Sequence, residues 1–318
     1  NLHKLDETAV TTTYGADTLV PGSAQTATAL ASGVLTNRNY VGVNTNKEKI
    51  TTVMEQAEAH GWGTGLVSTA RITHATPAAF ASHVPHRDME NTIIEHYLKN
   101  EIDVVMGGGA RHLLPQSASG SRREDNKNMF NEFAKAGYQV FEGSNDLAKF
   151  RAFKPEGKDR VLATFTSSHM SYELDRDKDE EPSIAEMTKK SLEILEKRDK
   201  FFLMVEGGRI DHAAHANDPA GVVHDTLAFD KAIKVAYDFY KQHPEDTLII
   251  VGADHETGGL GLNSSEGLEY EYYVNLKALR AQKDTIEGGE KYTGDRAAYY
   301  EYIAANFGLK ELTKKEKS

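Results

Sequence analysis

The sequence contains no cysteine among its 318 residues. A chain without cysteine forms no disulfides, thiolate zinc sites or iron–sulfur clusters, and it has no cysteine nucleophile. If it binds zinc, oxygen and imidazole groups must hold the metal. The absence leaves the redox compartment open, because a protein without cysteine is compatible with any of them.

Positive charge is also scarce. Lys and Arg number 37 against 48 Asp and Glu, which gives a net charge of −11 with neutral histidine. Nucleic-acid binders cluster Lys and Arg against the phosphate backbone, so we do not expect nucleic-acid binding as the main role. No apolar run has the length needed to span a bilayer. The 39% hydrophobic residues suffice for one large core or two smaller ones.

Short apolar runs alternate with amphipathic stretches along the chain. The clearest helix follows Ser183, which forms a capping box with Glu186 three residues later. Such alternation favours an α/β fold with a mostly parallel central sheet and helices on both faces. Strands are predicted at residues 65–68, 103–106, 160–166, 201–205 and 247–251, and helices at 47–60, 183–195 and 220–243.

The pattern weakens from Asn263 onward into a Tyr-rich, charged region. We therefore predict a catalytic core of residues 1–262 and a peripheral C-terminal insert of residues 263–318. The chain opens without an initiator Met or the apolar segment of a signal peptide, so we expect it to have been processed, trimmed or excerpted.

Two groups of metal-type side chains follow predicted strands. Asp211 and His215 are four residues apart, so both can reach one cation from a single helical turn. Asp254 and His255 are adjacent and bind one ion only if the backbone turns, which the glycines after Thr257 permit. Taken singly, the first pair also fits a capping Asp and a surface histidine. Two such groups where neighbouring strands end favour a metal site, because ligands gather at that edge of a parallel sheet.

Ser23 precedes a helix of small residues that stops at Gly33. Its plainest role is that of an N-cap. A hydroxyl there also lies where the helix dipole and free amides favour an anion, so it could attack phosphorus and hold the resulting phosphate.

The segment 71–87 is crowded with hydroxyls, imidazoles and guanidinium groups. Arg87 ends it and has the planar fork that suits a tetrahedral oxyanion. A loop arginine is otherwise a common surface ion-pair partner.

Taken together, these segments resemble the alkaline phosphatase family. The shared motifs, in chain order, are Val20-Pro21-Gly22-Ser23-Ala24, then Thr73-His74-Ala75-Thr76-Pro77-Ala78 through Arg87, then Val205-Glu206-Gly207-Gly208-Arg209-Ile210-Asp211-His212-Ala213-Ala214-His215, and Ala253-Asp254-His255-Glu256-Thr257-Gly258-Gly259. Four motifs in one order are a far more specific signal than any single short pattern.

The resemblance implies a role for each matched residue. Ser23 matches the nucleophile that becomes phosphoserine, and Arg87 matches the clamp on two phosphate oxygens. The implied metal ligands are Asp211 and His215 for one zinc, Asp254 and His255 for a second zinc, and Thr76 and Glu206 for magnesium. His74 and His212 fall at variable positions of the family and are expected to tune the metal shell without ligating.

The resemblance also implies an activity and its setting. It predicts a three-layer sandwich fold and hydrolysis of phosphate monoesters with broad alcohol specificity, with two zinc ions and one magnesium ion as cofactors. Inorganic phosphate is the expected product. By the same likeness we expect a homodimer in the periplasm or secreted from the cell.

Three departures from the family pattern stand out. No Asp-Gly motif on a first strand precedes Ser23, and no histidine follows His255, although the family has a late His-Thr motif there. Gly22 stands where the family often has Asp. We therefore expect the chain to be the middle of a longer enzyme, without the family's first strand and last strands.

Other readings remain open. A sulfatase needs Cys or Ser in a Cys/Ser-X-Pro-X-Arg context, which the sequence around Ser23 lacks. A phosphodiesterase of the same superfamily generally uses a Thr nucleophile and has no counterpart of Arg87. A noncatalytic or truncated scaffold that kept the fold while losing ligands is the rival from another class.

Overall fold

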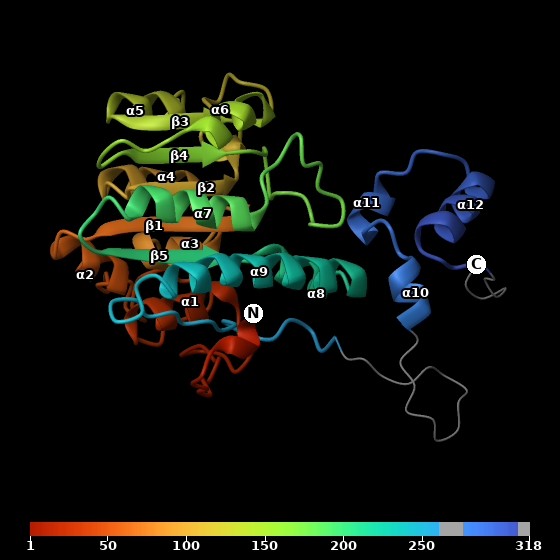
Figure 1. Ribbon diagram of the computed structural model, residues 1–318, viewed down its shortest axis with the longest axis horizontal. Coiled ribbons are helices and arrows are strands. Elements are labelled where there is room, and N and C mark those ends of the chain that lie inside the picture. The colour runs from red at the N-terminus through yellow and green to blue at the C-terminus, as the bar shows by residue number, and fades with distance from the viewer. Residues whose placement is uncertain (261–275, 311–318) are drawn as a thin grey trace. The chain divides into compact units, whose positions relative to one another are not determined.

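The computed structural model describes residues 1–260 and 276–310 of the chain. Its centre is a five-stranded sheet in the order β3-β4-β2-β1-β5, and each neighbouring pair is parallel (Figure 1). The strands are β1 (Gly63–Arg71), β2 (Val104–Gly108), β3 (Tyr138–Glu142), β4 (Arg160–Thr164) and β5 (Phe201–Glu206). The predicted parallel sheet is therefore confirmed.

Helices lie between the strands, before the first strand and after the last. They are α1 (Ser23–Ser32), α2 (Val53–Ala59), α3 (Ala75–Ala81), α4 (Glu90–Lys99), α5 (Met129–Lys135), α6 (Leu147–Ala152), α7 (Ile184–Leu195), α8 (Arg209–His215), α9 (Pro219–Tyr240), α10 (Leu276–Ala281), α11 (Ile286–Glu290) and α12 (Arg296–Asn306). Short 3-10 turns occupy Leu2–Lys4, Ala110–His112 and Ser144–Asp146.

Both faces of the sheet are buried. Successive strand residues point to opposite faces, and Leu66 and Val105 join one apolar cluster while Val67 and Met106 join the other. Side chains of α3, α4 and α5 cover the first face, and those of α6 and α7 cover the second (Figure 1). This double cover explains why the strands read as uninterrupted apolar runs.

Two helices begin where a capping box satisfies their first amides. The box predicted for Ser183 and Glu186 is present, and α7 starts at the next residue. A second box joins Thr52 and Glu55, so α2 begins at Val53. The helix predicted from residue 47 therefore started too early, because the cap at Thr52 outweighs the polar residues before it.

The strand predicted at residues 247–251 is wrong, because that segment has no regular secondary structure. Leu248 and Ile250 are each 83% exposed. An apolar run becomes a strand only when a neighbouring strand accepts its backbone hydrogen bonds. The sequence pattern reports apolar character and does not identify that neighbour.

The edge strand β3 was not predicted. Tyr138 and Phe141 are buried while Gln139 and Glu142 are exposed. The two buried residues are three positions apart and join opposite apolar clusters, so these five residues show neither regular alternation nor a continuous apolar run.

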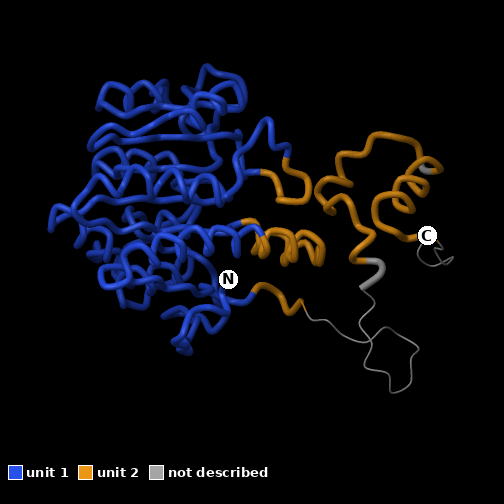
Figure 2. Tube along the Cα trace, in the orientation of Figure 1, with its two compact units in different colours: residues 1–170, 177–208, 228–256 blue, residues 171–176, 209–227, 257–318 orange. Residues whose placement is uncertain are grey.

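The chain divides into two compact units (Figure 2). Unit 1 contains residues 1–170, 177–208 and 228–256, and unit 2 contains residues 171–176, 209–227 and 257–318. The predicted boundary between residues 262 and 263 lies outside the described residues, so the division into a core and a Tyr-rich insert stays a prediction. Across the part of the chain that the structure describes, no helix is both long and apolar enough to cross a membrane.

Candidate active site

In unit 1, the predicted magnesium ligand Glu206 lies at the carboxyl end of the sheet. Glu206 is the last residue of β5 and lies in register with Ser68 of β1. The Ser68 hydroxyl donates to the Glu206 carboxylate. A side chain at Gly208 would put its Cβ 2.8 Å from the Cβ of Ala70, so glycine permits the close approach of the two chains here.

Ser23 is the first residue of α1, and Gly22 holds the N-cap position. Its role as an N-cap, which the sequence left open, is therefore excluded. The Oγ atom of Ser23 instead lies 3.2 Å from Nε2 of His255, and the serine is only 7% exposed. The first N–H groups of a helix lack intrahelical partners, so this hydroxyl lies where an anion is favoured.

Asp254 and His255 converge on the same point. The Asp254 Oδ2 atom lies 3.4 Å from His255 Nε2 and accepts a hydrogen bond from Thr26 at 3.4 Å. His255 Nδ1 lies 2.7 Å from the carbonyl oxygen of Glu256, which can only accept, so Nδ1 carries the proton. The lone pair of Nε2 therefore faces the Ser23 hydroxyl and is available to a metal.

The spacing of these atoms fits zinc. Zinc bonds to oxygen and imidazole nitrogen are about 2.0–2.1 Å long, so two ligands of a tetrahedral ion lie about 3.3 Å apart. The two separations from His255 Nε2, 3.2 Å to Ser23 and 3.4 Å to Asp254, match that value.

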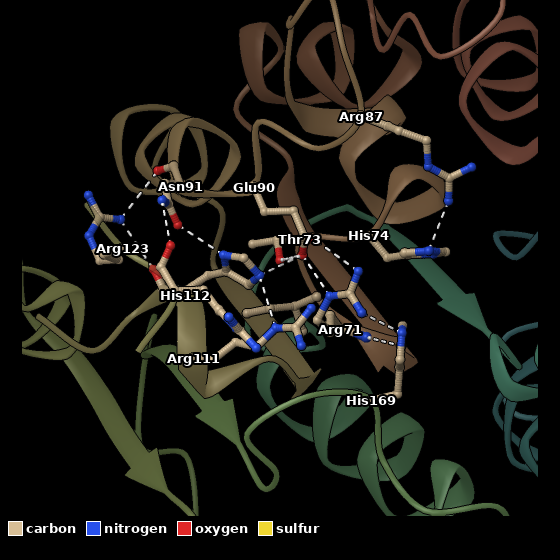
Figure 3. Close-up of polar contacts among 12 residues, drawn as sticks. Arg71, Thr73, His74, Arg87, Glu90, Asn91, Arg111, His112, Arg123 and His169 are labelled. Carbon is tan, nitrogen blue, oxygen red and sulfur yellow. Dashed lines mark hydrogen bonds and ion pairs between the residues drawn. The ribbon is translucent and has the colours of Figure 1, made fainter. Parts of the chain in front are cut away.

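Arg87 approaches His74 from the segment after α3. One guanidinium nitrogen of Arg87 lies 2.8 Å from His74 Nε2, which must accept (Figure 3). The backbone N–H of Arg87 donates to Asn39 at 2.9 Å, and Val41 and Val84 form an antiparallel bridge. The segment after α1 therefore fixes the backbone from which Arg87 extends.

Thr76 lies in the first turn of α3 and is 8% exposed. Its hydroxyl and the Glu206 carboxylate are hard oxygen donors of the kind that magnesium prefers. Thr76 lies in the helix that follows β1, and Glu206 is the last residue of β5, the neighbouring strand.

In unit 2, Asp211 and His215 lie one turn apart on α8. Oδ1 of Asp211 is 3.6 Å from Nε2 of His215, and it accepts a hydrogen bond from Thr257 at 2.8 Å. The predicted pairing on one helical turn is therefore present. The separation is close to that of two ligands on one zinc ion.

His212 points to a different partner on the same helix. Its Nδ1 atom lies 3.1 Å from a guanidinium nitrogen of Arg209. Arg209 also pairs with Glu287 at 2.6 Å and stacks over the ring of Tyr172 at 3.7 Å. The side chain of Arg209 thus serves to hold unit 2 together.

A buried polar network in unit 1 escaped the sequence analysis. It joins Arg71, Thr73, Glu90, His112 and His169 (Figure 3). Arg71 and Thr73 belong to the polar segment already noted. The other members, Glu90, His112 and His169, come from other parts of the chain. Sequence spacing therefore carries no signal for the network.

Comparisons with known proteins agree on one family. The family model "Alkaline phosphatase" matches residues 1–311. The repressible alkaline phosphatase of Saccharomyces cerevisiae is 38% identical over 284 residues, which cover 82% of this chain and 50% of the relative. Alkaline phosphatase 3 of Bacillus subtilis is 38% identical over 273 residues, covering 83% and 55%.

The solved structures point the same way. The alkaline phosphatase of Thermus thermophilus is 31% identical with a TM-score of 0.82, and the likeness covers 93% of this chain and 62% of that one. The predicted sandwich fold is thus confirmed, and the chain spans about half the length of the curated relatives it matches. The chain belongs to the alkaline phosphatase family.

Proposed function

We propose that this chain carries the catalytic site of a phosphomonoesterase that works through a phosphoserine intermediate. The observation that carries the proposal is the convergence of Ser23 Oγ and Asp254 Oδ2 on Nε2 of His255, with separations that fit a zinc ion. A nucleophile at a helix N-terminus beside metal-type ligands suits phosphoryl transfer, because the free amides favour an anion and metal ions can hold the attacking oxygen.

The proposed reaction has two displacements. Ser23 Oγ loses its proton and bonds to phosphorus while the bond from phosphorus to the alcohol oxygen breaks, and the alcohol leaves with a proton. Water then attacks the phosphoserine, which returns Ser23 and releases inorganic phosphate. The metals, when bound, would supply positive charge that lowers the pKa of the hydroxyl and of water.

The protein's own side chains position the phosphoryl group. The guanidinium of Arg87 would hold two of its oxygens by parallel hydrogen bonds and neutralise charge in both displacements. The free amides of the first turn of α1 would stabilise the phosphate once it is attached to Ser23. Because these contacts stop at the phosphoryl group, we propose broad specificity for the alcohol.

The same proposal assigns the metals. Asp254 and His255 would hold one zinc, Asp211 and His215 another, and Thr76 and Glu206 a magnesium ion, with His74 and His212 outside the ligand shell. A mutant alkaline phosphatase from the Antarctic bacterium TAB5, 27% identical with a TM-score of 0.70, is described with Mg bound in its M3 site. We extend the proposal to export from the cytoplasm and to a homodimer.

The test is hydrolysis of a chromogenic phosphomonoester by the native, full-length protein, together with its metal content. We expect turnover that a chelator abolishes and about two zinc ions per chain. A protein that is folded but holds no zinc and hydrolyses nothing would be a scaffold. Turnover of a sulfate ester or phosphodiester in preference to a monoester would identify one of the other superfamily activities.

A further inference from the structure

A buried ion pair joins the last residue of β1 to the first residue of α4. Arg71 donates to both carboxylate oxygens of Glu90, at 2.8 Å each, and the two side chains are 13% and 8% exposed. Thr73 donates to the same carboxylate at 2.6 Å. Such a bidentate pair fixes the plane of the guanidinium as well as its position.

The charges around this pair favour Arg71 as the partner of Glu90. Burial alone would raise the pKa of Glu90, but the hydrogen bonds and charges of Arg71, His112 and Thr73 outweigh it and lower that pKa. Burial, with the charges of Arg111 and Arg71, lowers the pKa of His112 to about 4 against the opposing effect of Glu90. Near neutral pH, therefore, the pair consists of the Glu90 carboxylate and the Arg71 cation.

Besides Glu90, Arg71 contacts His169. The backbone N–H of Arg71 lies 3.2 Å from Nδ1 of His169, and the guanidinium contacts Nε2 of the same ring. Arg71 offers only N–H donors, and a neutral imidazole accepts at one nitrogen, so one of these two contacts is a hydrogen bond. Arg71 therefore holds one edge of the His169 ring.

His169 in turn packs against His74. The two ring centroids are 5.3 Å apart, and the rings meet edge to face at 84°. Nε2 of His74 accepts from Arg87 at 2.8 Å. Figure 3 shows the polar contacts at the two ends of this series, between Arg71 and His169 and between His74 and Arg87.

We propose that Arg71 and Glu90 are positioning residues for phosphate binding. Through His169 and His74, they hold the guanidinium of Arg87 in the orientation that meets a phosphoryl group. This inference rests on the proposed function, in which Arg87 binds phosphate. Arginine has a long, flexible side chain, and a clamp that must be ordered at each binding event binds more weakly than one that is already oriented.

The experiment compares variants of the full-length, metal-loaded protein by calorimetric titration with inorganic phosphate. Arg71→Met removes the cation, and Glu90→Gln keeps the shape while removing the charge. Arg198→Met is the matched control, because Arg198 pairs with Asp103 in a similarly buried setting just before β2 begins. Melting temperatures show whether the variants lose comparable stability.

We expect Arg71→Met and Glu90→Gln to weaken phosphate binding by roughly 10- to 100-fold. Arg198→Met should change it less than twofold. In a background that already carries Arg87→Ala, Arg71→Met should add almost nothing, because the residue through which it acts is gone.

Two results would overturn the proposal. One is an equal loss of phosphate affinity in Arg198→Met, which would mark the effect as general destabilisation. The other is full additivity of Arg71→Met with Arg87→Ala. If the wild-type protein binds phosphate but hydrolyses no monoester, the proposed function fails while the titrations still decide the positioning role. A wild-type protein that does neither overturns both.

Discussion

The Ser23 hydroxyl lies 3.2 Å from Nε2 of His255, although the two residues are 232 positions apart in the chain. Ser23 starts the small-residue helix α1, and His255 follows an irregular segment after α9. On this approach we base the proposed roles of Ser23 as nucleophile and of His255 as metal ligand.

Replacing Ser23 by Ala should reduce kcat for a phosphomonoester by on the order of 10³-fold or more, because the atom that bonds to phosphorus is removed. Ser32→Ala is the matched control at the opposite end of the same helix. Its hydroxyl donates to the carbonyl oxygen of Thr28 at 2.6 Å. Steady-state kinetics measure both. Near wild-type turnover in Ser23→Ala would remove that serine from the chemistry.

Introducing Asp at Gly22 should tighten the inhibition of the full-length enzyme by phosphate. Gly22 has extended backbone angles that any residue adopts, and a Cβ there would lie 3.1 Å from the side-chain amide of Gln25. A carboxylate next to Ser23 would pair with Arg87 and hold it, which slows phosphate release. We expect the inhibition constant to fall roughly tenfold, about 1.4 kcal/mol.

The uncharged variant Gly22→Asn is the control for the added side chain. It should leave the inhibition constant for phosphate within about twofold of wild type, because it brings no charge to Arg87. An unchanged constant in Gly22→Asp would show that a carboxylate at this position does not strengthen the hold of Arg87 on phosphate.

Glu58 makes the protein less stable in alkaline solution. Burial, aided by the charges of Glu55, Asp103 and Glu101, raises the pKa of Glu58 to about 7 against the hydrogen bond from Thr64. The folded state therefore binds the proton more tightly than the unfolded chain does. This contribution to stability is complete below the ordinary pKa of 4.5 and is lost as the pH rises through about 7.

Glu58→Gln keeps the side-chain shape and the acceptor for Thr64 while removing the charge. We expect it to stabilise the protein at pH 8 by about 1 kcal/mol, after allowance for solvent screening, and to have little effect at pH 4. Denaturant unfolding at the two pH values measures the difference. Glu156→Gln is the exposed control, because Glu156 is not among the groups that raise the pKa of Glu58, and an equal gain there would contradict the assignment to burial.

The chain of residues 1–318 should bind zinc weakly when it is expressed alone. Each proposed zinc has two protein ligands here, whereas catalytic zinc sites use three. We expect little hydrolysis and a low zinc content by elemental analysis. Vigorous turnover that a chelator abolishes would show that the ligands named here suffice.

Much of this fold could be predicted because its local signals agree with its global arrangement. The capping box at Ser183 and the buried run before Glu206 placed α7 and β5 correctly. The strand prediction at residues 247–251 was wrong, because an apolar pattern does not show whether a neighbouring strand will pair with the segment. The strand β3 was missed because its five residues show neither regular alternation nor a continuous apolar run.

Part of the candidate site could likewise be predicted from local motifs, and part could not. Ser23, Arg87 and the paired ligands lie in short motifs that a family resemblance can identify. The partners of Arg71 could not be predicted, because Glu90 and His169 reach it from separate segments. Contacts made by tertiary packing alone leave no fixed spacing in the sequence.

The most direct test of the account is where the phosphoryl group resides during turnover. The full-length, metal-loaded protein would be quenched in acid while it hydrolyses a phosphomonoester, digested, and analysed by mass spectrometry. The account predicts one added phosphoryl group on Ser23 and none in the Ser23→Ala variant. Steady turnover with no phosphoryl group on Ser23, or with one on another residue, would contradict it.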